Sequence, residues 1–374
     1  MAFNEDFMSE NLKRTPLHAF HVEHGARMVP FAGWEMPVQY TSILDEHKAV
    51  REKAGLFDVS HMGEVRVHGA DARNYLNTLV TNDVEKLSVG KAIYTVMCYE
   101  DGGVVDDLII YQVGDEEYLL CINASNVEKD VEWMAGQVVG FECLIDNVSD
   151  NFGQLALQGP EAMAILEDVT GQDFSALKRF HFIQGVFFDT QAIISRTGYT
   201  GEDGVELYLP AGETARVANL IYESGKDRGL CLTGLGARDS LRLEAGYPLY
   251  GHEISSTINP LAGGLAWVVK LAKGRRFTGQ DALERIKENG IEKRIVFFRM
   301  EDRRIARQGT SVIDADGNTV GEVLSGTQSP MLGKPIGSAL VPGGQARIGA
   351  ELFVEIRGKR FQIEVARPPL HIID

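Results

Sequence analysis

Residues 92–111 read AIYTVMCYEDGGVVDDLIIY, two apolar runs joined by the turn sequence Glu100-Asp101-Gly102-Gly103. A short connection of acids and glycines between β-branched and aromatic residues is typical of a β-hairpin. We therefore expect one strand over 92–99 and a second over 104–111.

Two adjacent acids, Asp106 and Asp107, interrupt the second apolar run. Side chains alternate across a strand, so the two carboxylates point to opposite faces, and Asp107 shares its face with Ile109 and Tyr111. A carboxylate on a partly buried strand is costly unless it is paired or used. Two interpretations stay open: both acids are hydrogen-bonded turn or edge residues, or one of them faces a cleft and handles a proton.

Outward from this hairpin, strands and helices intermix without a regular βαβ rhythm, which predicts an α+β fold. Capping residues, Pro and Gly mark the expected helices: Ser42 to Gly55, 72–79 after Asp71, Pro160 to Gly171, 212–228, Gly236 to Gly246, and Thr278 to Asn289 with Gly290 as the stop. Short strands with Gly-rich turns follow, expected over 293–299, 319–325, 336–341, 351–356 and 360–366.

This change of pattern predicts a separate all-β barrel or sandwich at the C-terminus. The 374 residues suffice for two or three domains at roughly 150 residues each. We expect the boundary between 275 and 292, dividing the chain into a region 1–280 and a barrel domain 285–374.

The formal net charge is −16, from 37 basic and 53 acidic residues, which disfavours nucleic acid and anionic membranes as partners. The first 14 residues carry acids and no apolar core, so we expect neither export nor mitochondrial import. The cysteines Cys98, Cys121, Cys143 and Cys231 form no CxxC pair. Disulfide, zinc-ribbon and iron–sulfur frameworks are therefore disfavoured, and a cytoplasmic location is expected.

Common cofactor motifs are missing from the sequence. Neither GxxxxGK[ST] nor GxGxxG occurs, despite 40 glycines, so nucleotide binding by a standard loop is not expected. The histidines His18, His21, His24 and His61 cluster loosely near the N-terminus, without the acids or cysteines of a ligand pattern. We expect no metal site.

Glu206 follows a Gly-rich turn in RTGYTGEDGVELYLP (196–210) and falls on an expected strand. A lone carboxylate aimed into a pocket suits a ligand with two adjacent N–H donors, such as an amino-pyrimidinone ring. The alternative is an exposed strand residue, which is the commoner case.

The segment GLGARDSLRLEAGYPLYGHE (234–253) places Arg238 in the first turn of an expected helix and Arg242 four residues on. A basic residue there opposes the helix dipole, a cost that makes sense if an anion binds. Pairing of these arginines with Asp239 or Glu244 is an equally weighted alternative.

Residues 270–308 carry twelve Lys and Arg against six Asp and Glu, a local excess of +6. The stretch is either a solvated surface with scattered ion pairs or a docking face for an acidic partner.

Six segments in order resemble one family closely: PFAGWEMPVQY (30–40), GLFDVSHMGEVRVHG (55–69), GGVVDDLIIY (102–111), RTGYTGEDGVELY (196–208), GLGARDSLRLEAGYPLYGHEI (234–254) and SGTQSPMLGKPIGSALV (325–341). They are similar to the T-protein, or aminomethyltransferase, family of the glycine cleavage system. The similarity runs from about residue 14 to about 366, and six ordered segments make it highly specific.

The resemblance implies a three-domain cloverleaf with a central folate pocket, two interleaved α+β domains and a C-terminal β-barrel. It implies transfer of a one-carbon unit from the aminomethylated lipoyl arm of a carrier, the H-protein, to tetrahydrofolate as co-substrate. The products are 5,10-methylenetetrahydrofolate and ammonia, and no metal takes part.

The resemblance also implies roles for individual residues. Asp107 matches the catalytic aspartate, Glu206 the pterin-binding glutamate and Arg238 the substrate-binding arginine. The remaining pocket positions fall on Met62, Tyr94, Ile109, Tyr111, Asn123, Tyr199 and Tyr247. The tail ARPPLHIID lacks the family's usual aromatic or basic run, so Arg367 and His371 both stay candidates for the tail contact.

Lipoyl carriers of this system are typically acidic, so the resemblance suggests docking of the H-protein on the basic stretch, through some of Arg275, Arg276, Arg303 and Arg304. Two alternatives stay open. One is another folate-dependent demethylase on the same scaffold. The other is a non-catalytic folate-binding protein, which usually carries a Cys in a KGCYxGQE-like segment; residues 273–281 here have none.

Overall fold

The computed structural model describes residues 12–372 and resolves the chain into two compact units. Unit 1 comprises the segments up to Tyr75, from Val84 to Tyr94 and from Leu108 to Asp239. Unit 2 comprises Leu76–Asp83, Thr95–Asp107 and the chain from Ser240 onward. The division of the sequence at 280–285 stays a prediction, because the units are built from interleaved segments.

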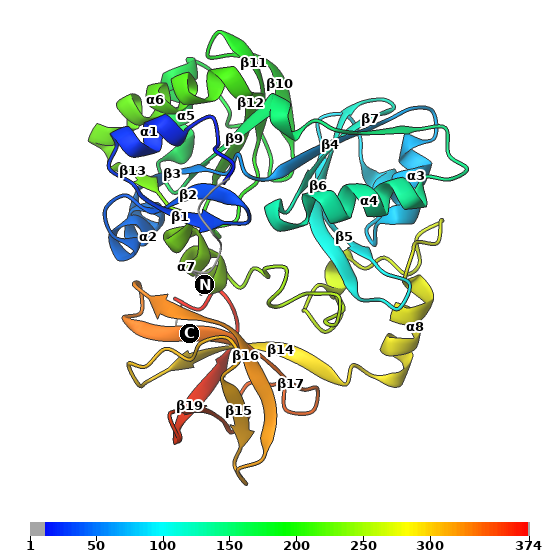
Figure 1. Ribbon diagram of the computed structural model, residues 1–374, viewed down its shortest axis with the longest axis vertical. Coiled ribbons are helices and arrows are strands. Elements are labelled where there is room, and N and C mark those ends of the chain that lie inside the picture. The colour runs from blue at the N-terminus through cyan, green and yellow to red at the C-terminus, as the bar shows by residue number, and fades with distance from the viewer. Residues whose placement is uncertain (1–11, 373–374) are drawn as a thin grey trace. The chain divides into compact units, whose positions relative to one another are not determined.

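Unit 1 contains a six-stranded sheet that is antiparallel except for its last pair. In spatial order its strands are β10 (Phe182–Phe187), β11 (Thr190–Ser195), β12 (Gly204–Pro210), β9 (Phe152–Gln158), β3 (Ala54–Asp58) and β13 (Leu230–Thr233). Helices α5 (Ala162–Thr170) and α6 (Thr214–Gly225) pack on each other and on this sheet (Figure 1). Their apolar faces bury Ile165, Val217 and Ile221 against Leu155 and Leu207. This burial is the main stabilising term for the layer.

A five-stranded sheet has the order β5 (Ala92–Cys98), β6 (Val104–Gly114), β7 (Glu117–Ile122), β4 (Gly63–His68) and β8 (Leu144–Asn147). The predicted hairpin over 92–111 is thereby confirmed, with its second strand three residues longer. Both paired acids lie within β6 and not in its turn: Asp106 is fully buried and Asp107 half-buried. The interpretation of these acids as turn residues is therefore wrong.

Further elements of unit 1 are α1 (His18–Glu23), the two-stranded sheet of β1 (Arg27–Phe31) and β2 (Trp34–Gln39), α2 (Ile43–Glu52) and α4 (Val127–Gln137). Helix α3 (Ala72–Leu79), strands β5 and β6, and helix α7 (Leu235–Ala245) each continue from one unit into the other.

Unit 2 contains a closed barrel, which confirms the expected C-terminal β domain (Figure 1). Around the barrel the strands are β14 (Lys293–Met300), β17 (Lys334–Pro342), β16 (Thr319–Ser329), β15 (Ser311–Asp314), β18 (Leu352–Ile356) and β19 (Lys359–Ala366). Val296, Phe298, Val323, Val354 and Ile363 fill its core. Strand β15 was not predicted, because four residues carry too little alternation to be recognised.

Within unit 2, a buried ion pair connects α7 with the barrel. Nη1 of Arg242 lies 2.8 Å from Oε2 of Glu253, and both side chains are at most 1% exposed. Arg242 also donates to Ser325 on β16, and Ser338 on β17 donates to Glu253. The acid paired with Arg242 therefore lies 11 residues further on, beyond the end of α7.

The bounds of three helices in unit 1 differ from the expected ones. Ser42 caps α2 as predicted, accepting a 3.1 Å hydrogen bond from the Asp45 N–H, but the helix ends at Glu52 and Gly55 belongs to β3. A side chain at Gly55 would meet Val50 at 2.4 Å, so close packing, not a helix stop, requires glycine here. Pro160 precedes α5, and the expected helix 212–228 ends at Gly225 before a 3₁₀ turn.

Helix α8 (Gln280–Asn289) begins two residues later than expected and stops at Gly290 as predicted. Among the helices of residues 12–372, none combines the length and the apolar character that crossing a bilayer demands.

Candidate functional site

Glu206 is the central acid of a buried polar cluster in unit 1. It is 6% exposed on β12, so the alternative of an exposed strand residue is wrong. Oγ1 of Thr197 donates a 2.5 Å hydrogen bond to its Oε2, and Nε2 of Gln154 lies 3.4 Å from its Oε1. Burial raises the pKa of Glu206, and the Thr197 hydrogen bond and the charge of Arg238 oppose the rise. The carboxyl group still has lone pairs to offer a ligand with N–H donors.

The turn before β12 is shaped around the side chain of Gln158. Nε2 of Gln158 donates to the carbonyls of Thr197 and Val205, which flank the turn. A Cβ at Gly198 would overlap Oε1 of Gln158 at 1.8 Å, and Gly204 has φ +153°. The glycines of RTGYTGEDG therefore let the loop close on Gln158, which positions Thr197 against Glu206.

Two buried tyrosines connect the five-stranded and six-stranded sheets. The Tyr208 hydroxyl on β12 donates to the Tyr111 hydroxyl on β6 at 3.0 Å, and Gln154 donates to Tyr208 at 3.1 Å. Their rings meet edge to face with centroids 5.3 Å apart. Met62 and Ile109, both predicted pocket residues, pack against the same cluster as these tyrosines.

Arg238 lies in the first turn of α7, as predicted, with its guanidinium 4.7 Å from the ring centroid of Tyr199. This cation–π contact brings together two predicted site residues. The start of α7 is held by the buried Glu46, whose carboxylate accepts from the backbone N–H groups of Gly234, Tyr40 and Thr41.

His61 is a buried histidine beside Met62 whose role the sequence did not reveal. It is 3% exposed, and Nδ1 has no hydrogen-bond partner among residues 12–372. Burial and the nearby charge of Arg238 lower its pKa to about 4, so the ring is neutral at pH 7. In the sequence, only its position next to the predicted pocket residue Met62, within the segment 55–69, could have indicated that His61 lies near the site.

The other N-terminal histidines have structural contacts. Nε2 of His21 lies 2.8 Å from Oδ2 of Asp58, and His18 is paired with Glu35. His24 contacts the carbonyl of Phe20. Within the described part of the chain, no group of three or more His, Cys, Asp or Glu side chains is arranged to hold a metal ion.

The remaining predicted site residues are distributed over both units. Tyr94 and Asn123 belong to unit 1 and are half-buried, the first on β5 and the second just after β7. Asp107 and Tyr247 belong to unit 2 and are also half-buried. Each unit therefore carries part of the predicted set.

The two tail candidates differ in their surroundings. Arg367 is exposed, whereas Nδ1 of His371 lies 3.2 Å from Oε1 of the buried Glu244, within unit 2.

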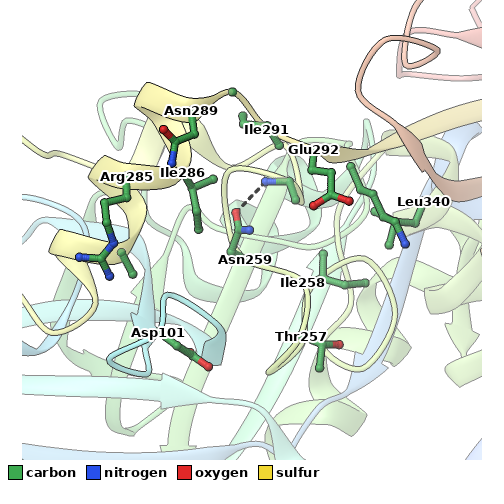
Figure 2. A pocket seen from close by; sticks show the side chains of 14 residues that line it. Asp101, Thr257, Ile258, Asn259, Arg285, Ile286, Asn289, Ile291, Glu292 and Leu340 are labelled. Atoms are coloured by element: carbon green, nitrogen blue, oxygen red, sulfur yellow. Dashed lines mark hydrogen bonds between the residues drawn. The ribbon is translucent and has the colours of Figure 1, made fainter.

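A groove of about 560 Å³ lies wholly within unit 2 (Figure 2). Helix α8 contributes Arg285, Ile286 and Asn289, and the turn of the β5–β6 hairpin contributes Asp101 (Figure 2). Its charged lining residues are Asp101, Arg285, Glu292 and Lys293. Positive and negative charges balance there, so the groove itself has no net positive charge.

Two family models match the chain. The GCVT N-terminal domain matches residues 17–273, and the glycine cleavage T-protein C-terminal barrel domain matches residues 293–371. The first match contains every predicted site residue from Met62 to Tyr247.

Similar proteins cover nearly the whole chain. A relative from Lysinibacillus sphaericus named aminomethyltransferase is 48% identical over 365 residues, 97% of this chain and 99% of the relative. Another of that name from Geobacillus kaustophilus is 50% identical, with 96% and 99% covered. The crystal structure of glycine cleavage system aminomethyltransferase T from Bartonella henselae aligns with a TM-score of 0.90 at 34% identity, covering 96% of this chain and 98% of that one.

Proposed function

The chain belongs to the glycine cleavage T-protein family of aminomethyltransferases, and on that premise we propose that Glu206, Arg238 and Asp107 are its principal folate-site residues. Glu206 binds the amino-pyrimidinone edge of tetrahydrofolate, and Arg238 contacts the substrate. Asp107 acts near the reacting nitrogens.

The reaction moves one carbon from a sulfur to two nitrogens. The carbon of the aminomethyl group leaves the lipoyl sulfur and the amino nitrogen, and it forms bonds to N5 and N10 of tetrahydrofolate. The protons given up by N5 and N10 end on the thiol and the departing ammonia. The products are the dihydrolipoyl carrier, 5,10-methylenetetrahydrofolate and ammonia.

Asp107 is assigned the task of orienting the folate near N10 and moving protons as ammonia departs. Holding the two reactants in reacting geometry lowers the activation barrier by an amount on the order of several kcal/mol. Proton transfer by a placed carboxylate adds roughly 10²–10⁴-fold. No covalent intermediate with the protein is needed, because the carbon arrives already activated on sulfur.

The observation that supports this proposal most strongly is the state of Glu206. A carboxyl group that is 6% exposed and oriented by Thr197 and Gln154 is costly to maintain for structure alone. Two adjacent ligand N–H donors would satisfy its remaining lone pairs. The same proposal assigns the other contacts to Met62, Tyr94, Ile109, Tyr111, Asn123, Tyr199 and Tyr247.

We propose the H-protein as partner, docking on the basic stretch 270–308. Arg276 is already paired with Asp281 and Glu284, and Arg304 with Asp302, so these two contribute less to docking than their charge suggests. Exposed cations of the stretch that form no ion pair among residues 12–372 carry most of the attraction: Arg285, Lys287, Lys293, Arg294, Arg303 and Arg307. Charge complementarity of this kind mainly raises the association rate.

A cytoplasmic location and the three-domain arrangement belong to the same proposal. The four free cysteines, of which Cys98 and Cys121 are buried, support a reducing compartment.

Ammonia release from aminomethylated H-protein, measured with and without tetrahydrofolate, tests the function. We expect fast release only with tetrahydrofolate, together with formation of 5,10-methylenetetrahydrofolate. Folate binding without turnover would indicate a non-catalytic binder. Turnover of a small methylated amine but not of the carrier would indicate a demethylase.

A further inference from the structure

Glu64 is a buried carboxyl group for which the proposed reaction provides no use. It lies on β4 and is 1% exposed, and neither carboxyl oxygen has a hydrogen-bond partner among residues 12–372. A buried polar group without partners costs about 1–3 kcal/mol, and more when it is charged. Such a group therefore requires an explanation.

The strand register places Glu64 on the same sheet face as predicted pocket residues. Glu64 on β4 is opposite Cys121 on β7, and Cys121 is opposite Ile109 on β6. Directly opposite residues share a face, so the three side chains form one row across the sheet. Ile109 and Cys121 belong to the cluster that includes Met62 and Tyr111.

A short chain of contacts leads from this row to Glu206. The Cys121 thiol lies 3.7 Å from Oε1 of Gln154, and Nε2 of Gln154 reaches Glu206. The negative charges of Glu64 and Glu206 both raise the pKa of Cys121, after burial itself, which indicates that both acids are close to it. Glu64 is thus a second acid beside the cluster that contains the pterin-binding candidate.

Burial raises the pKa of Glu64 well above its ordinary value, which favours the protonated, neutral form of the carboxyl group. A neutral carboxylic acid presents one O–H donor next to one C=O acceptor. Its complement is a ligand edge with an acceptor next to an N–H donor. A tetrahydropterin has such an edge at N1 and N8–H, adjacent to the 2-amino and N3–H edge proposed for Glu206.

We propose that Glu64 binds the N1/N8–H edge of the reduced pterin and thereby selects reduced over oxidised folate. This inference rests on the proposed function. Oxidised folic acid has no hydrogen on N8, so its N8 is an acceptor that faces the acceptor oxygen of Glu64. Selection follows because a buried polar group discriminates strongly against a ligand that leaves it unpaired.

Two variants separate hydrogen bonding from packing. Glu64→Gln keeps a donor beside an acceptor at nearly the same shape, whereas Glu64→Met removes both with a side chain of similar length. Equilibrium dissociation constants for tetrahydrofolate and folic acid are measured by titration calorimetry on the full chain, and thermal unfolding of each ligand-free variant shows that it is folded.

For Glu64→Met we expect about tenfold weaker tetrahydrofolate binding, less than twofold change for folic acid, and a higher unfolding temperature without ligand. Glu64→Gln should keep the wild-type ratio of the two constants. An unchanged ratio in folded Glu64→Met overturns the assignment of Glu64 alone. Failure of the wild-type chain to bind tetrahydrofolate overturns the proposed function, and this inference with it.

Discussion

The Thr197 hydroxyl and Oε2 of Glu206 are joined by a 2.5 Å hydrogen bond in the buried core of unit 1. The bond determines which carboxyl oxygen is already occupied, since the other has only the 3.4 Å contact with Gln154. Thr197 in turn owes its position to the turn that closes on Gln158.

Replacement of this hydroxyl should weaken both the fold and the site. Thr197→Val keeps the shape but leaves a buried carboxyl oxygen without its donor, so we expect a loss of about 1–3 kcal/mol in the free energy of unfolding. Chemical denaturation at pH 7 measures it. Thr197→Ser is the control, because it keeps the hydroxyl; an equal loss in both variants would contradict the hydrogen-bond argument.

Asp107→Asn should separate chemistry from binding. The amide cannot accept a proton as the carboxylate does, so turnover should fall by roughly 10²-fold or more. Tetrahydrofolate affinity should stay within about twofold, since shape and polarity are kept. Single-turnover kinetics with aminomethylated carrier gives the first quantity and calorimetry the second. Wild-type turnover in this variant would remove Asp107 from its proposed role.

Glu206→Ala should show the opposite pattern. Loss of a charge-assisted acceptor costs about 1.5–3 kcal/mol, or roughly 10–100-fold in tetrahydrofolate affinity. Turnover at saturating folate should fall much less. The comparison variant is Glu202→Ala, on the same loop but paired with Arg51 instead; if both variants bind tetrahydrofolate as the wild type does, the pterin assignment of Glu206 is wrong.

The buried Arg242–Glu253 ion pair should make the stability of the folded protein sensitive to acid. Burial opposes ionisation of Glu253, but the charge of Arg242 and several hydrogen bonds outweigh it and lower its pKa. An acid whose pKa is lowered by folding stabilises the folded state fully at a pH above its unfolded-state pKa, about 4.5. This stabilisation is lost as the pH falls through the lower folded-state pKa.

Glu253→Gln should therefore cost about 3–5 kcal/mol at pH 7, because Arg242 is left buried without its counter-charge. The stability difference from the wild type should shrink below about pH 4.5. Urea unfolding at pH 7 and pH 3.5 checks both statements, with the exposed Glu364→Gln as control. A constant difference across this range would show that the ion pair is not responsible.

Charge reversal on the basic stretch should weaken carrier docking. For Arg285→Glu with Arg303→Glu, we expect slower association with H-protein and a smaller dependence of the association rate on salt. Stopped-flow mixing at two salt concentrations measures both. The control is Lys48→Glu, a charge reversal at an exposed residue of α2. Equal association rates for the wild type, the double variant and this control would rule out docking on 270–308.

Local patterns predicted the β5–β6 hairpin and most strands of the barrel, because alternation and turn chemistry act over a few residues. They also placed Glu206 on a strand and Arg238 in a first helical turn. They could not show that Glu206 is buried, since its partner Gln154 is 52 residues away in the sequence. The sequence could not reveal the burial of Glu64 for the same reason: β4 is an internal strand only because it pairs with β7 and β8, which are distant in the sequence.

Lys273 belongs to the basic stretch but contributes nothing to a docking surface. Its ammonium donates to the carbonyls of Asn77, Val80 and Asn82 and to the side-chain amide of Asn77, all within unit 2. An amine so engaged cannot attack an acylating reagent, whereas the exposed Lys287 can. The acylation rate of Lys273 would consequently report how often the segment 76–83 opens transiently while the rest of the molecule stays folded.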